Sequence, residues 1–259
     1  MRPLSELGAS EATCLHGLLF DVDDTLLTRG KLTEPAFSAL HQLATAGLEL
    51  IAVTGRSASF AEMIGQQWPI AGAIAENGAL SVLPGTQQDQ AIDPLSNEHR
   101  QRHNRQLQAL CRDIQQQCPE LRPSTDAHLR RSDFTYDIGE YRQPEPTLVE
   151  RATEIARAQG AWVTRSSLHL HVSFERSDKA TGAIGFLSAR GVDETSARHR
   201  FAFIGDSDND GPCFAAFHTT IAVNNFCGRP SVPPRYLTPS GYGRGFAEAA
   251  GHLCRLRRQ

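Results

Sequence analysis

The stretch LLFDVDDTLL, residues Leu18–Leu27, decides the fold of this chain, because an apolar run leads directly into three carboxylates. A short apolar run that ends in polar residues is typical of a buried central strand in a parallel sheet. Asp21 and Asp23 are two residues apart and would leave such a strand on the same face. Two carboxylates this close repel each other and raise their pKa values unless a cation lies between them. The stretch therefore predicts a site that needs a metal ion, a proton, or both.

Apolar strands and amphipathic helices alternate after this stretch. A helix is expected from Thr33-Glu34-Pro35, a strand at residues 48–53, and a third strand at residues 70–75. The pattern resumes with a helix capped by Asp178, followed by buried strands at residues 201–204 and 219–223. Alternation with short connections indicates parallel βαβ units. We expect an α/β protein with a doubly wound, Rossmann-like parallel sheet.

The alternation breaks between the third strand and the helix capped by Asp178. This region predicts a long polar helix at residues 96–118, a half-exposed strand at 133–138, another helix from Pro144, and a hairpin at 161–172. Such an order is an α+β unit of its own. We therefore expect a core domain formed by residues 1–84 and 173–259, with a second domain, residues 85–172, inserted into it.

Composition excludes several classes of function. The chain has 259 residues, 40% of them hydrophobic and 21% charged, as in ordinary globular proteins. A net charge of −3 gives no sign of a nucleic-acid partner. We find neither a signal peptide nor an apolar run long enough for a membrane span. Six cysteines without a C-x-x-C pair suggest free thiols in a reducing compartment, so we expect a cytoplasmic protein.

Reactive side chains follow four of the expected strands. They are Asp21 and Asp23, Thr54, the pair Glu76-Asn77, and the acidic run from Asp206 to Asp210, with Lys179 at the start of a helix. Ligands of open α/β sheets bind beyond the carboxyl ends of the strands, so these side chains should converge. Carboxylate oxygens favour Mg²⁺, and a hydroxyl, backbone amides and an ammonium suit a phosphoryl group.

Simpler interpretations compete with several of these assignments. The loop from Asp206 begins like an EF-hand calcium loop, but its twelfth position is Phe217 instead of Glu, and a strand precedes it. We interpret His169 and His171 as half-exposed strand histidines, not metal ligands. Asn77 is either a turn residue or a substrate contact.

Arg130 and Arg131 have two interpretations of equal weight. They either reach an anionic substrate or form a solvated basic pair. Asp133 and Tyr136, a few residues further on, are additional candidates for substrate contact.

The motifs, in their order, resemble the haloacid dehalogenase superfamily of phosphotransferases. The matching pieces are DVDDTL from Asp21, Thr54-Gly55-Arg56, Lys179, and GDSDND from Gly205. The insertion, together with Glu76-Asn77-Gly78, resembles the subclass with a large α/β cap, the Cof and sucrose-phosphatase-like group. The resemblance implies that residues 85–172 are a cap that confers substrate specificity.

The resemblance also implies residue roles. Asp21 would attack phosphorus and form an aspartyl-phosphate, and Asp23 would act as general acid and base. The implied Mg²⁺ site comprises Asp21, Asp23 through its carbonyl, Asp206 and Asp210. The implied phosphate-binding residues are Thr54, Gly55, Lys179 and Asn209. Family members commonly carry Gly where this chain has Asp24, for which we derive no role.

We therefore expect a Mg²⁺-dependent phosphomonoesterase acting on a small-molecule phosphate ester, with a sugar phosphate as the favoured class. Asn77, Arg130 and Arg131 are the candidate substrate contacts. Two alternatives stay open: a sugar phosphomutase of the same fold, and a non-catalytic module that senses phosphate or metal. Loss of Asp21 or Asp23 would mark the latter, and both are present.

Overall fold

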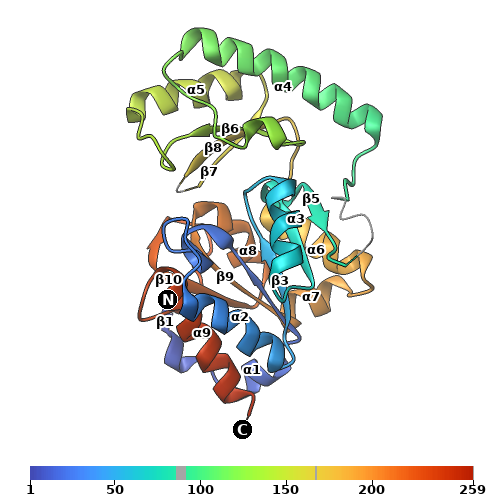
Figure 1. Ribbon diagram of the computed structural model, residues 1–259, viewed down its shortest axis with the longest axis vertical. Coiled ribbons are helices and arrows are strands. Elements are labelled where there is room, and N and C mark those ends of the chain that lie inside the picture. Colours follow the sequence, from blue (N-terminus) through green and yellow to red (C-terminus); the bar gives the residue numbers. More distant parts are fainter. Residues whose placement is uncertain (86–91, 167, 259) are drawn as a thin grey trace.

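The computed structural model describes residues 1–85, 92–166 and 168–258. In this part of the chain the main sheet has eight strands in the order β1-β11-β10-β9-β2-β3-β4-β5 (Figure 1). Neighbouring strands are parallel except for β5, which pairs antiparallel with β4. The strands are β1 Arg2–Pro3, β2 Gly17–Phe20, β3 Glu49–Val53, β4 Gly72–Ala75, β5 Leu80–Val82, β9 Phe201–Ser207, β10 Thr219–Cys227 and β11 Tyr236–Leu237. The predicted α/β class with a mostly parallel sheet is confirmed.

Helices cover both faces of this sheet. Strand β2 lies in its middle and alternates between two apolar clusters: Leu18 and Phe20 pack on one side, Leu19 on the other. The helices on the first side are α1 Ala9–Cys14, α2 Glu34–Thr45, α3 Ala58–Gln67 and α9 Tyr242–Leu256. Those on the second side are α6 Lys179–Ala189, α7 Glu194–Arg200 and α8 Gly211–Ala216. Burial on both faces explains why the central strand reads as a continuous apolar run.

A second, three-stranded sheet belongs to what we call the inserted layer. Its antiparallel strands have the order β6-β8-β7, with β6 Phe134–Asp137, β7 Trp162–Arg165 and β8 His169–Ser173. Its helices are α4 Asn97–Gln117 and α5 Pro146–Ala158, and Figure 1 shows them on the side of the small sheet away from the main sheet. Polar side chains of the small sheet therefore face the ends of the core strands.

The expected exposure of the β8 histidines is wrong. Leu170 and Val172 pack beneath α4 and α5, so the alternating side chains of His169 and His171 point to the opposite face. The loops at Gly55 and Asn77 lie against His171, and Glu140 lies 3.0 Å from His169, so only 4% of His169 and 3% of His171 is exposed. Tyr136 belongs to the apolar interior of the inserted layer and is not placed to contact a substrate.

One edge of the main sheet is formed by β1 and β11, two strands of two residues each that the sequence pattern did not predict. Residues 84–93 are polar and rich in turn-forming residues, which predicts a loop, and most of them, residues 86–91, lie outside the described residues. Strand β9 leads directly into the acidic loop at Asp206, which confirms that this loop is not an EF-hand. Among the described helices, none combines the length and apolar character of a membrane span.

Candidate active site

Three buried carboxylates meet at the carboxyl ends of the central strands. Asp21 directly follows β2, Asp206 lies near the end of the neighbouring β9, and Asp210 closes the short turn after it. Ligand oxygens of all three lie within 4.8 Å of one another. The loop itself fixes Asp210, whose Oδ2 accepts hydrogen bonds from the backbone amides of Asp206 (2.9 Å) and Ser207 (3.1 Å). Thr25 donates its hydroxyl hydrogen to Asp206 Oδ1 at 3.0 Å.

Lys179 brings one positive charge to this cluster. Its Nζ lies 2.8 Å from Asp21 Oδ1 and 2.7 Å from Asp210 Oδ1, and the side chain is fully buried. The residue opens α6 beneath its predicted cap, Asp178, which accepts a hydrogen bond from the Thr181 amide at 2.8 Å. Gly78 permits this placement, because a Cβ there would lie 2.0 Å from the Asp178 carbonyl oxygen.

The electrostatics of the cluster favour a cation. Burial raises the pKa of Asp21 to about 7 even though Lys179 opposes the shift. Burial, and then the charges of Asp21 and Asp210, raise the pKa of Asp206 well above its usual range. Burial alone would lower the pKa of Lys179, but the two carboxylates outweigh it and raise that pKa. Three acids share one ammonium, and an all-oxygen donor set with excess negative charge fits Mg²⁺.

Magnesium affinity is therefore expected to rise with pH between about pH 6 and about pH 8. Below about pH 7 the Asp21 carboxyl carries a proton that Mg²⁺ must displace, and above it the carboxylate is free to bind. Affinity should fall by up to about tenfold for each pH unit below the pKa. Isothermal titration calorimetry of the wild type across this range measures the effect. An affinity independent of pH would show that the carboxylates are already ionised.

The backbone conformation of the turn after Asp21 explains why an aspartate can occupy position 24. Its φ of +54° and ψ of 4° lie in the left-handed region, which glycine adopts freely and aspartate tolerates. The Asp24 carbonyl accepts a hydrogen bond from Asn225 Nδ2 at 2.9 Å. The position thus requires a backbone conformation, not a third charge, which explains why Asp can stand where Gly is common.

Asp23 does not join the three-acid cluster with its side chain. Arg56 donates two hydrogen bonds to its carboxylate, at 2.8 Å and 2.7 Å. The same guanidinium lies 3.6 Å from Glu140 of the inserted layer, and Glu140 lies 3.0 Å from His169 Nε2. No role was predicted for Arg56, although a basic residue three positions after the end of β3, in a loop expected to face acidic loops, was a usable signal.

The other residues predicted to bind phosphate lie on adjoining loops. The backbone N–H of Asn77 donates to the backbone carbonyl of Thr54 at 3.1 Å, and the side-chain Nδ2 of Asn209 donates to Asn77 Oδ1 at 3.5 Å. The Ser207 hydroxyl donates to Asn209 Oδ1 at 2.6 Å and so orients the side-chain amide of Asn209. A Cβ on Gly55 would lie 3.1 Å from Asn77 Oδ1 and would press on this arrangement. The structure thus gathers these loops around one point.

Arg130 joins the inserted layer to the core. Its buried guanidinium donates to the Gly55 carbonyl at 2.6 Å, to Asp133 at 2.9 Å and to Asp126 at 3.1 Å. The interpretation as a solvated basic pair is therefore wrong for Arg130. Arg131 has a half-exposed guanidinium that lies 3.7 Å from Glu62.

Glu76 makes a second connection that the sequence analysis did not anticipate. This buried carboxylate accepts hydrogen bonds from the Ser132 amide and hydroxyl, both at 2.7 Å, and from the Arg131 amide at 3.0 Å. Its φ of +50° is left-handed, so the turn after β4 is held in an unfavourable conformation. This role could not be predicted from the local sequence, because the residues that donate to Glu76 lie more than fifty positions further along the chain.

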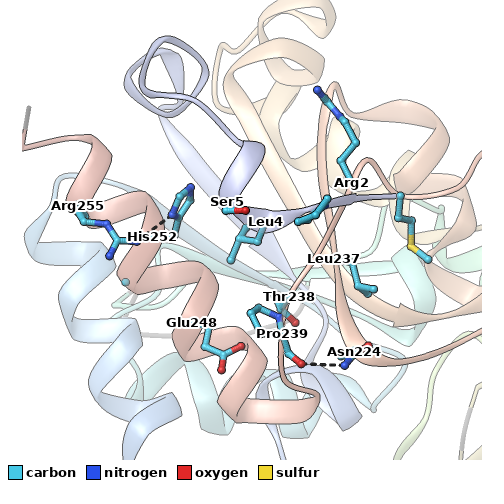
Figure 2. Close-up of a pocket in the computed structure, with 13 residues that line it drawn as sticks. Arg2, Leu4, Ser5, Asn224, Leu237, Thr238, Pro239, Glu248, His252 and Arg255 are labelled. Atoms are coloured by element: carbon cyan, nitrogen blue, oxygen red, sulfur yellow. Dashed lines mark hydrogen bonds between the residues drawn. The ribbon is translucent and has the colours of Figure 1, made fainter.

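A separate hollow of about 730 Å³ lies between the amino-terminal strand and α9 (Figure 2). The residues that line it include Arg2, Leu4, Asn224, Leu237, His252 and Arg255. None of its lining residues belongs to the acidic cluster or to the loops around Gly55. It is therefore distinct from the candidate active site.

Comparison with known proteins places these features in context. Residues 18–118 match the family model of haloacid dehalogenase-like hydrolases. Among curated proteins, none matches the sequence.

Solved structures share the fold over almost the whole chain. A Thermoplasma acidophilum protein, 0175, is 18% identical, with a TM-score of 0.73 over 93% of this chain and 99% of that one. A phosphatase of the haloalkanoate superfamily from Bacteroides thetaiotaomicron is 21% identical, with a TM-score of 0.65 over 92% and 95%. The sucrose-phosphatase of Synechocystis sp. PCC6803, in complex with sucrose and phosphate, is 20% identical, with a TM-score of 0.62 over 92% and 98%.

Proposed function

We propose that this chain is a Mg²⁺-dependent phosphatase of small phosphate esters, because residues 18–118 match the family model of haloacid dehalogenase-like hydrolases. The observation that carries the proposal is the buried cluster of Asp21, Asp206 and Asp210 around Lys179. Keeping three carboxylates and one ammonium out of water is costly for stability, so such a cluster is a candidate for chemistry.

Asp21 is the proposed nucleophile. Its carboxylate would attack phosphorus, form an aspartyl-phosphate and break the bond to the leaving oxygen. Asp23 would protonate that oxygen and later take a proton from the water that hydrolyses the intermediate. The two hydrogen bonds from Arg56 hold the Asp23 carboxylate in a fixed position two residues after Asp21, as the base step of this role requires.

A bound Mg²⁺ would offset the negative charge between Asp21 and the transferring phosphoryl group. The residues proposed to hold it are Asp21, Asp206 and Asp210, with the carbonyl of Asp23. The phosphoryl oxygens would accept hydrogen bonds from Lys179, the Thr54 hydroxyl, the Gly55 amide and Asn209 as charge redistributes. Lys179 already occupies the position beside the nucleophile that this role demands.

We propose that the inserted layer is the cap and that its boundaries are the predicted residues 85–172. Hydrogen bonds through Arg130 and Glu76 hold it over the strand ends, where it would exclude water from the reaction.

Sugar phosphates are the favoured substrates, and Asn77 and Arg131 are the residues proposed to contact them. The fold of the sucrose-phosphatase and of a trehalose-6-phosphate phosphatase related protein supports this class. Arg130 would act by fixing the cap, and the cytoplasmic location stays a prediction.

A panel of phosphorylated metabolites, scored by release of inorganic phosphate with Mg²⁺ or with a chelator, tests the proposal. We expect Mg²⁺-dependent release from at least one sugar phosphate, without a bisphosphate activator. Isomerisation of a sugar phosphate that requires the activator would support the phosphomutase alternative. Binding of phosphate without turnover of any ester would support the sensing module.

A further inference from the structure

One buried nitrogen in the site has no partner. His171 stands in the middle of β8 and is 3% exposed, yet its Nε2 has no hydrogen-bond partner among the residues that the structure describes. The adjacent ring carbon, Cε1, lies 3.3 Å from the position that a Cβ on Gly55 would occupy. An unpaired buried polar atom is unfavourable, so one beside a loop proposed to bind phosphate calls for a ligand.

Its neighbours fix the protonation of this ring. Nδ1 lies 2.9 Å from Asp133 Oδ2, which can only accept, and farther from two donors, Asn77 Nδ2 at 3.1 Å and Arg130 Nη2 at 3.5 Å. The shortest contact is the one to the charged acceptor, so we assign the hydrogen to Nδ1. Burial alone would raise the pKa of Asp133, but the charge of Arg130 outweighs it and holds that pKa below its usual range, so the carboxylate accepts the Nδ1 hydrogen. Burial also lowers the pKa of His171, which keeps the ring neutral. Nε2 therefore carries a lone pair and can only accept a hydrogen bond.

We propose that His171 determines substrate specificity by accepting, at Nε2, a hydrogen bond from a hydroxyl group of the leaving alcohol. The inference rests on the proposed phosphatase function. Phosphoryl oxygens of the ester are acceptors and cannot satisfy this lone pair, so the donor must come from the rest of the substrate. Asp133 is a positioning residue that acts through the histidine ring, and it is itself held by Arg130.

Two kinds of ester separate this role from a general one. The variant His171→Leu is assayed with hexose phosphates, which carry hydroxyl groups, and with p-nitrophenyl phosphate, which carries none. We expect kcat/KM for the best hexose phosphate to fall by about tenfold or more, because the acceptor is lost. For p-nitrophenyl phosphate we expect a change of less than about twofold. His171→Asn retains a polar partner for Asp133 but lacks an atom at Nε2, so it should show the same selective loss if the Leu variant does not fold.

His103→Leu is the matched control. It makes the same chemical change in α4 of the inserted layer, at a histidine whose Nδ1 also lacks a partner within the described residues. It should leave both activities unchanged. Equal losses for both esters in the His171 variants, no loss for either, or a wild type that hydrolyses only the aryl ester would overturn the inference. A wild type that hydrolyses neither ester would instead refute the proposed function.

Discussion

Replacing Asp21 with Asn is expected to reduce phosphate release by about a thousandfold or more, because removal of a nucleophile removes the main reaction path. The carboxamide has nearly the same shape but cannot form the acyl phosphate. The measurement is the steady-state rate of release of inorganic phosphate from p-nitrophenyl phosphate with saturating Mg²⁺. Circular dichroism of the same preparation verifies that the variant is folded.

Asp24→Asn is the matched control for that substitution. It makes the same change three residues along the chain, at a position whose φ of +54° asparagine adopts readily. Since the Asp24 site requires a conformation more than a charge, we expect activity within about twofold of the wild type. Equal losses in the two variants would mean that the loop as a whole, and not the Asp21 carboxylate, carries the activity.

Replacing Lys179 with Met is expected to lower both activity and stability. The buried ammonium contacts Asp21 and Asp210, and its removal leaves buried carboxylates without a counter-charge. The free energy of unfolding should fall by about 3 kcal/mol in alkaline solution, where the carboxylates are ionised. Chemical denaturation followed by circular dichroism measures this loss.

The pH dependence of that loss has a definite sign. The pKa of Asp21 is already about 7 in the wild type, and it should rise further without the ammonium. Protonation of Asp21 relieves the repulsion in the variant, so the stability difference between variant and wild type should be largest in alkaline solution and should shrink as the pH falls toward about 7. Added Mg²⁺ should restore part of the stability but not the activity. An unfolding free energy equal to that of the wild type would show that Lys179 does not neutralise the cluster.

Much of the core was predictable from sequence because local pattern and topology agree there. The apolar run before Asp21 is buried on both faces, so its burial depends little on which layer covers it. Parallel strands place their carboxyl ends at one edge, so acids that follow separate strands must meet. The predicted fold is confirmed by its likeness to solved structures, and residues 18–118 match the family model of haloacid dehalogenase-like hydrolases.

The inserted layer was less predictable because its exposure depends on packing between distant segments. The alternation of polar and apolar residues along β8 correctly places His171 and Leu170 on opposite faces of the strand. It cannot reveal that loops of the core cover the face of His171. Arg130 looks like a surface residue until Gly55, 75 residues earlier, is seen to accept its hydrogen bond. The left-handed conformation of Asp24 is equally invisible in composition, since aspartate is only one of several residues that tolerate it.

The most direct test of the account is the release of inorganic phosphate from p-nitrophenyl phosphate by the purified wild-type protein, before chelation, after chelation, and after Mg²⁺ is restored. The account predicts release that stops on chelation and returns with Mg²⁺. Release that continues unchanged after chelation, or no release from a folded protein at any stage, would contradict it.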